Sequence, residues 1–240
     1  MEIQETKQLI NEAKNIYLIP SEEPEAITST MALFYTLKEL NKNVNLVLDN
    51  LPENLKFLAP SLDFISYPKN FVISVPNSVA QVSQIYYEKN SDALKIHLTL
   101  ENGNIKKDNI AFYFAEAKPD LIITIGIKDY AKELEEKLNS FGFLLDSPIL
   151  NIDTSTPLSA GNKQDNKKFG KINMLQEGSL SEVILSLREN ITRESATCLL
   201  AGLVIYTENF TKNLTADIFQ TVSNLMKKGA SLEEVTNNIK

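Results

Sequence analysis

The chain has 240 residues, and 43% of them are hydrophobic, which is ordinary for a globular protein. Acidic residues outnumber basic ones by 31 to 24, so the formal net charge is −7, and this excess argues against a sequence-independent grip on the nucleic-acid backbone, which needs a basic stripe. A single cysteine and a single histidine exclude internal disulfides and zinc sites built from these residue types.

The polar N-terminal segment and the apolar runs give an expected location. The N-terminal residues form an amphipathic pattern, unlike a signal peptide. The longest apolar run, residues 196–206, is too short to span a membrane. Because the one cysteine, Cys198, fits a reducing compartment, we expect a cytoplasmic protein without a membrane partner.

The first fifth of the chain predicts a parallel sheet. Residues 3–14 have the pattern of a short amphipathic helix, and residues 15–20 that of a strand stopped by Pro20. Residues 25–42 carry apolar side chains at helical spacing, and residues 43–49 form the next strand. The order strand, helix, strand is a unit from which parallel sheets are built.

The middle of the chain predicts further strands and a hairpin. Residues 70–78 are expected to form a third strand, ended by Pro76. The alternating segments 81–89 and 93–103, joined by three polar residues, predict an antiparallel hairpin that stands apart from the parallel core. Residues 119–126 are apolar on both faces, which is typical of a strand in a parallel sheet.

The remaining chain predicts a helix, one last strand, a loop and a helical C-terminal third. The expected segments are a helix at 128–142 closed by Gly142, a strand at 148–153, a loop at 154–170, and helices at 179–190, 192–209, 214–229 and 231–240. Cys198 and Leu203 fall on the predicted buried face of the third-last helix. We therefore expect a single α/β domain over residues 1–240, with a parallel sheet flanked by helices and a hairpin insertion at about 78–101.

Ligands of open α/β sheets bind outside the carboxyl ends of the strands, so a site is expected there. Glu22, Glu23 and Glu25 follow the first strand, and Asp153 ends the last one. The sequence has no glycine-rich phosphate loop and no nucleophile elbow, which leaves metal-assisted chemistry based on carboxylates. On the residues alone, the better explanation of the glutamates is that they are ordinary first-turn acids, which the helix dipole favours.

From about residue 15 to 235 the order of segments resembles the N-terminal domain of the DHH phosphoesterase family. The stretch "IPSEEPEAITSTMAL" is similar to the first family motif, His-x-x-x-Asp-x-Asp-Ala-Ile-x-Ser. Ile19 takes the position of the histidine, Glu23 and Glu25 those of the two aspartates, and Ser29 that of the serine. Family members hydrolyse short oligonucleotides, cyclic-dinucleotide products or single-stranded ends with two Mn²⁺ or Mg²⁺ ions.

The other family motifs are present in altered form. In "NIDTST", Asp153 is kept, and Thr154 and Ser155 replace the two histidines of Ile-Asp-His-His. "KFGKINMLQEGSLSEVI" is similar to the Phe-Gly-x-x-Asn motif and the serine-rich helix start that follows it. "GLVIYTENF" keeps the glycine, threonine and phenylalanine of the last motif, with Tyr206 in place of its aspartate. A further family aspartate closes an internal strand, where Pro76 or Gly126 would stand here.

The resemblance implies a degraded metal site. Glu23, Glu25 and Asp153 would hold at most one Mn²⁺ or Mg²⁺ weakly, since both histidines and two aspartates of the family pattern are replaced. The leading hypothesis is therefore a catalytically degenerate protein whose cleft binds a small phosphorylated ligand or nucleotide, or whose surface binds a protein partner. The expected ligand-binding residues are Ser29, Asp153, Thr154 and Ser155.

Two other hypotheses stay open. One is an active phosphodiesterase for short oligonucleotides or dinucleotides with a rearranged metal site. The other is an unrelated α/β protein with similar strand ends, which would scatter Glu23, Glu25, Asp153 and Tyr206 over different faces. The family's usual second, substrate-binding domain has no counterpart in this sequence, no extended nucleic-acid surface is expected, and the oligomeric state is left open.

Overall fold

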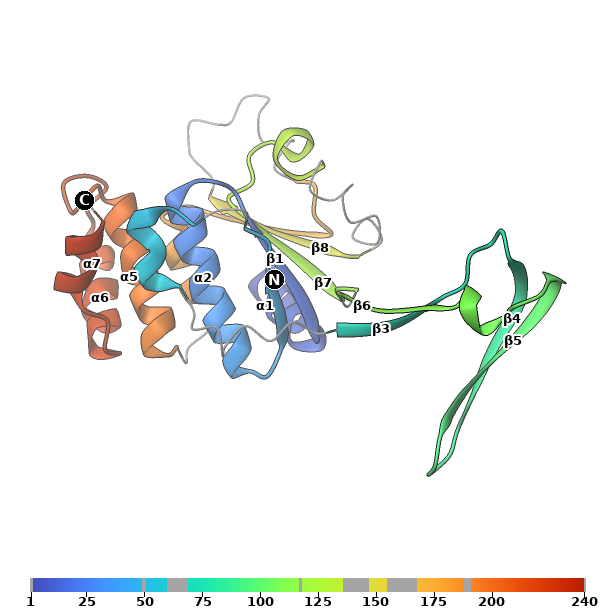
Figure 1. Ribbon diagram of the computed structural model, residues 1–240. Helices are drawn as coiled ribbons and strands as arrows, with labels where there is room; N and C mark the ends of the chain where they lie inside the picture. The colour runs from blue at the N-terminus through green and yellow to red at the C-terminus, as the bar shows by residue number, and fades with distance from the viewer. Residues whose placement is uncertain are drawn as a thin grey trace. The chain divides into compact units, whose positions relative to one another are not determined.

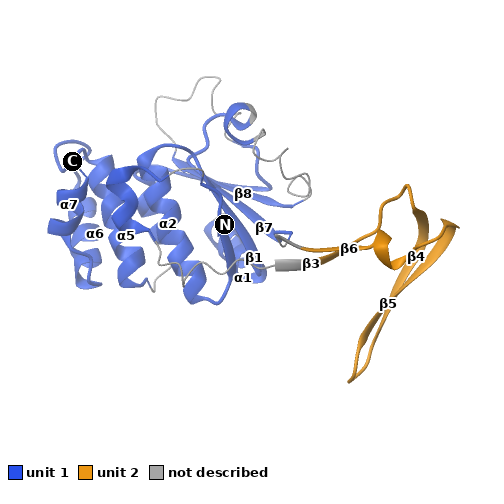
Figure 2. Cartoon of the chain, viewed as in Figure 1, with its two compact units in different colours: residues 1–67, 118–240 blue, residues 68–117 orange. Residues whose placement is uncertain are grey.

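A computed structural model describes residues 2–48, 51–59, 69–116, 118–135, 147–154, 168–187 and 191–239. The chain divides into two compact units, a first unit of Met1–Tyr67 and Lys118–Lys240 and a second unit of Pro68–Ala117 (Figure 2). The second unit is larger than the hairpin insertion expected at about 78–101, because it also includes a strand on each side of the hairpin.

The first unit contains a five-stranded sheet whose neighbouring strands are all parallel (Figure 1). Its strand order is β2-β1-β7-β8-β9. The strands are β1 Asn15–Pro20, β2 Asn43–Leu46, β7 Leu121–Ile125, β8 Ile149–Thr154 and β9 Ile172–Gln176. Together with the flanking helices, this sheet confirms the α/β fold class predicted from the sequence.

The helices of the C-terminal third begin at side-chain caps. The described α-helices are α1 Glu2–Glu12, α2 Pro24–Glu39, α4 Leu180–Ser186, α5 Arg193–Tyr206, α6 Ala216–Lys227 and α7 Leu232–Asn238. Ser179 and Glu182 form a capping box at α4, and the Thr192 hydroxyl accepts a hydrogen bond from the Ser195 amide at α5. The helical C-terminal third is therefore confirmed, and no helix in the described ranges is long and apolar enough to cross a membrane.

The sheet buries side chains on both faces, as its continuous apolar strands predict. Ile16 and Leu18 of β1 belong to the large core under α2, α4 and α5. Tyr17 and Ile19 of the same strand belong to a smaller cluster on the opposite face. Cys198 and Leu203 of α5 are buried in the large core, as expected from their helical spacing.

Three expectations about the elements need correction. The strand predicted at 70–78 is β3, Lys69–Ser74, and it pairs antiparallel with β6, Ala111–Glu116, instead of joining the parallel sheet. The strand at 148–153 is not the last one, because β9 follows it and pairs with β8. The helix predicted at 128–142 is described only as a π-helical turn, Ala131–Glu135, and the rest of it lies outside the described residues.

The second unit also contains the predicted hairpin. Its strands are β4, Ala80–Lys89, and β5, Leu94–Gly103, which pair antiparallel with register shifts around Val82. The Asn90 side chain accepts hydrogen bonds from the Asp92 and Ala93 amides, so it closes the turn between the strands.

Candidate functional site

The candidate site lies where the strand order of the sheet reverses. The chain runs from strand β1 to β2 on one side of it, and later continues through β7, β8 and β9 on the other side. Such a switch point between neighbouring carboxyl ends is where open α/β sheets bind ligands. Here the Ser21 amide after β1 donates a hydrogen bond to the Ile125 carbonyl at the end of β7 (2.9 Å).

Glu25 is the central acid of this region. It lies in the first turn of α2 and is half-buried, and its Oε1 accepts a hydrogen bond from the Leu180 amide at the start of α4 (2.6 Å). Burial raises the pKa of Glu25 to about 7; backbone hydrogen bonds from Leu180 and Ser181 oppose this rise, and the nearby charges of Asp153 and Glu182 add to it. Near neutral pH the carboxyl is therefore only partly ionised.

Asp153 and Tyr206 join Glu25 at the same edge. Asp153, at the end of β8, is buried, and its Oδ1 accepts a hydrogen bond from the Thr154 amide (2.7 Å). The pKa of Tyr206, at the end of α5, is raised by burial and then by the charges of Glu25 and Glu182. The structure thus brings together Glu25, Asp153 and Tyr206, three of the four residues expected to converge.

Glu23, the fourth residue, also follows β1, but its side chain pairs with Lys128 instead of joining the other three. It is the residue before α2, it is exposed, and its Oε1 forms an ion pair with Nζ of Lys128 in the segment after β7 (3.2 Å). In the parts of the chain that the structure describes, no group of three or more histidine, cysteine or acidic side chains is placed to hold a metal ion. Glu23 pairs with Lys128 and does not join Glu25 and Asp153 in such a group.

Pro76 and Gly126 were the two candidates for the end of the internal strand, and Gly126 is the one that ends a strand of the parallel sheet. It follows the internal strand β7, whereas Pro76 follows β3 in the second unit. Gly126 has φ +71°, a conformation that glycine adopts without strain. A Cβ at this position would lie 2.9 Å from Ala26 Cβ and 3.1 Å from Ser21 Oγ, so the site has no room for a side-chain ligand here.

The other predicted ligand-binding residues have different surroundings. Ser29 is fully buried, and its hydroxyl shares a hydrogen bond with that of Ser181 (3.3 Å), so it joins α2 to α4 inside the core. Gly202 of α5 packs against the Ser181 hydroxyl, because a Cβ added to this glycine would overlap Ser181 Oγ. Thr154 is half-buried beside Asp153, and Ser155 lies outside the described residues.

Two residues of the switch point were missed by the sequence reasoning. Lys128 is an exposed cation beside Glu23. The Ser21 hydroxyl is buried and has no hydrogen-bond partner among the described residues. Both follow directly after the strands β1 and β7, so the rule that ligands bind at strand ends was the available signal.

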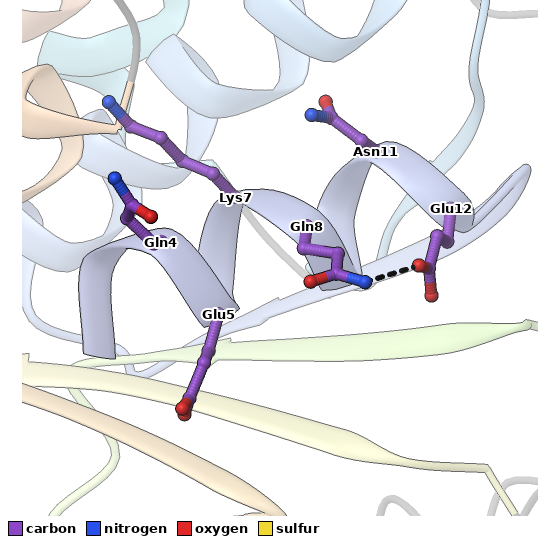
Figure 3. A pocket seen from close by; sticks show the side chains of 6 residues that line it. All are labelled: Gln4, Glu5, Lys7, Gln8, Asn11 and Glu12. Atoms are coloured by element: carbon purple, nitrogen blue, oxygen red, sulfur yellow. Dashed lines mark hydrogen bonds between the residues drawn. The ribbon is translucent and has the colours of Figure 1, made fainter. Parts of the chain in front are cut away.

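Two pockets in the described part of the chain lie away from this edge. One follows the outer surface of α1 (Figure 3). Its lining side chains are all polar and all come from that helix: Gln4, Glu5, Lys7, Gln8, Asn11 and Glu12. The other, of about 140 Å³ between α2, α5 and α7, is smaller than the ~300–1,000 Å³ of typical small-molecule sites. Neither pocket competes with the sheet edge as a ligand site.

Replacing Glu25 with glutamine is expected to stabilise the chain increasingly as the pH rises. The folded-state pKa of about 7 exceeds the ~4.3 of an unperturbed glutamate, so the folded wild type loses stability as the pH rises between these values. Glutamine has no proton to lose, and its carbonyl can still accept the Leu180 amide. Above pH 7 the gain in unfolding free energy should be on the order of 1–3 kcal/mol.

Urea unfolding at pH 5 and pH 8 measures this difference. The matched control is Glu22→Gln, which removes an exposed carboxylate near the same helix start and should keep the wild-type pH dependence. An advantage of Glu25→Gln that does not grow with pH would show that the Glu25 carboxyl is not destabilised by burial.

The comparisons with known proteins bear on the fold. No protein-family model matches the chain, and no curated protein matches it. Among solved structures, the chain is similar to the crystal structure of an exopolyphosphatase-related protein from Bacteroides fragilis, with a TM-score of 0.64 and 18% sequence identity. The match covers 99% of this chain and 59% of that one. The two proteins share a fold, and the chain spans little more than half the length of that neighbour.

Proposed function

We propose that the chain is a catalytically degenerate member of the DHH phosphoesterase family that binds a small phosphorylated ligand at the switch point between β1 and β7. The fold shared with an exopolyphosphatase-related protein supports the family, and so does the convergence of Glu25, Asp153 and Tyr206 at one sheet edge. The observation that carries the loss of catalysis is the hydrogen bond from the Leu180 amide to Glu25, which commits this carboxylate to the start of α4.

The other positions of the family pattern support the same conclusion. A two-metal site needs several charged ligands around two neighbouring ions. In this chain Glu23 is paired with Lys128, and Gly126 is too closely packed for a side chain. Ile19, at the position of a family histidine, is buried in the apolar cluster on the far face of the sheet. These positions offer packing contacts in place of metal ligands.

The proposed ligand is recognised by Lys128 and Ser21. The ammonium group of Lys128 is exposed and supplies positive charge in the segment after β7, and the buried Ser21 hydroxyl after β1 can donate a hydrogen bond to a phosphate oxygen. The carboxylates of Glu23, which pairs with Lys128, and of Asp153, Glu182 and Glu25 oppose an anion. Because Glu25 takes up a proton below pH 7, the repulsion that Glu25 exerts on a bound phosphate should be weaker at pH 6 than at pH 8.

We expect the purified chain to hydrolyse a linear dinucleotide no faster than a protein-free blank, with Mn²⁺ or Mg²⁺ present. Calorimetric titration of the chain with the same dinucleotide, in the absence of metal, should show binding that Lys128→Ala weakens roughly tenfold. Lys132→Ala is the matched control, since Lys132 is an exposed lysine nearby that pairs with Asp129.

The two measurements separate the parts of the proposal. Absence of dinucleotide binding, or equal effects of the two lysine variants, would overturn the ligand assignment. Mn²⁺-dependent cleavage that Glu23→Gln abolishes would overturn the loss of catalysis and establish an active phosphodiesterase with a rearranged metal site.

A further inference from the structure

The exposed large hydrophobic side chains of the described residues are concentrated in the second unit. In the described part of the first unit, the exposed large hydrophobic side chains are Leu40 and a few in and around α6. Those of the second unit are Phe71, Ile73, Ile85, Tyr86, Tyr87, Leu94, Ile96, Phe112 and Tyr113. Such a concentration is unusual for the surface of a soluble monomer and indicates an interaction surface.

The hairpin of β4 and β5 places most of its apolar side chains on one face. In its register Ile85 lies opposite Leu98 and Tyr87 opposite Ile96, and side chains directly opposite each other point to the same face. The alternation of β5 places Leu94 on that face too, and Lys89, opposite Leu94, stands at the end of the same face. We call the apolar residues Ile85, Tyr87, Leu94, Ile96 and Leu98 the hairpin face.

The reverse side of the hairpin is polar. Glu88 lies opposite Lys95, Gln84 opposite Thr99, and Tyr86 opposite His97, whose rings stack with centroids 4.5 Å apart. The hairpin is therefore amphipathic, although β4 and β5 form a sheet of only two strands. A two-stranded hairpin is marginally stable alone and needs its apolar face covered. In the described residues the hairpin face is largely exposed, with Ile85 at 71% and Tyr87 at 72%.

The charge of the second unit indicates which partner covers this face. Residues 68–117 contain five lysines and five acidic residues, so their net charge is zero, although the whole chain carries −7. The net negative charge lies entirely on residues 1–67 and 118–240. Two copies of the chain that meet through their second units avoid the repulsion that their acidic first units impose. A single-stranded nucleic acid would instead require a positively charged groove beside the aromatic side chains.

We propose that the chain forms a homodimer in which the hairpin faces of two copies pack against each other. Apart from Lys89 at its end, the face is apolar, so it can pack against a second copy of itself, as a two-fold interface requires, and homodimer interfaces are more apolar than other protein surfaces. Two hairpins stacked face to face form a small four-stranded sandwich whose outer faces carry Glu88, Lys95 and His97. This inference concerns the second unit and does not rest on the function proposed for the first.

Neighbouring tyrosines on opposite faces of β4 provide a matched test. Tyr87 belongs to the hairpin face, and Tyr86, which is 53% exposed, belongs to the polar side. Sedimentation velocity of the full chain at micromolar concentrations should show a dimer. Tyr87→Lys should raise the dissociation constant at least ~10-fold, because an unpaired charge is buried in the dimer, whereas Tyr86→Lys should leave it unchanged.

Thermal unfolding followed by circular dichroism verifies that both variants fold. If one variant fails to fold, Ile96→Lys and His97→Lys repeat the comparison on β5, where the same two faces alternate. A monomeric wild type would overturn the proposal. A dimer that both lysine variants weaken equally, or that neither weakens, would also overturn it.

Discussion

Replacing Leu203 with alanine should lower the free energy of unfolding by about 2–5 kcal/mol. Leu203 is fully buried in α5, in the large core that this helix shares with α2. The substitution removes three methyl or methylene groups from a closely packed site and leaves a cavity that its neighbours fill only in part. Urea unfolding monitored by circular dichroism measures the change.

Met226→Ala is the matched control for this prediction. Met226 lies in α6 and is exposed, so its truncation should change the unfolding free energy by less than ~0.5 kcal/mol. Equal midpoints for Leu203→Ala and the wild type would show that α5 presents another face to the core.

Gly126→Asp, which places an aspartate where the resembled family pattern has one, should destabilise the chain. A side chain in the left-handed conformation costs about 1–2 kcal/mol. Crowding of the new Cβ against Ala26 and Ser21 adds about 1–3 kcal/mol, as overpacked cores do. The expected loss of unfolding free energy is therefore roughly 2–5 kcal/mol.

Two alanine variants separate these contributions. Gly126→Ala carries both the conformational cost and the crowding. Gly229→Ala carries the conformational cost at φ +96°, and its new Cβ would meet only the flexible side chain of Arg193, at 3.3 Å. The excess destabilisation of Gly126→Ala over Gly229→Ala measures the crowding. Equal effects would show that the sheet edge at Gly126 is open enough for a side chain.

The fold was predictable where local signals agree with each other. The caps at Ser179 and Thr192 and the helical spacing of Cys198 and Leu203 determine helices whose buried faces follow from the same residues. The pairing of β3 with β6 was not predictable in this way. An apolar run indicates a strand but not its partner, and the partner here lies about 40 residues along the chain. The edge strand β9, with half-buried ends, gave too weak a pattern.

The candidate site was predictable in its acids but not in their contacts. The rule about strand ends, together with the family resemblance, led to Glu25, Asp153 and Tyr206, which do lie together. The bond between Glu25 and the Leu180 amide joins residues 155 positions apart, and the pairing of Glu23 with Lys128 joins residues 105 positions apart. Such contacts depend on how the elements pack, so the motif alone does not predict them.

The ladder between β3 and β6 has a consequence for how this chain is organised. Lys69 and Glu116, near the two ends of the second unit, are direct partners in that ladder, so the chain enters and leaves the unit at neighbouring points. A short loop between these points would bypass the whole insertion at little entropic cost, since loop closure depends only weakly on length. Removal of the second unit in this way would leave the strand order of the parallel sheet unchanged, because β3 and β6 pair with each other and not with that sheet.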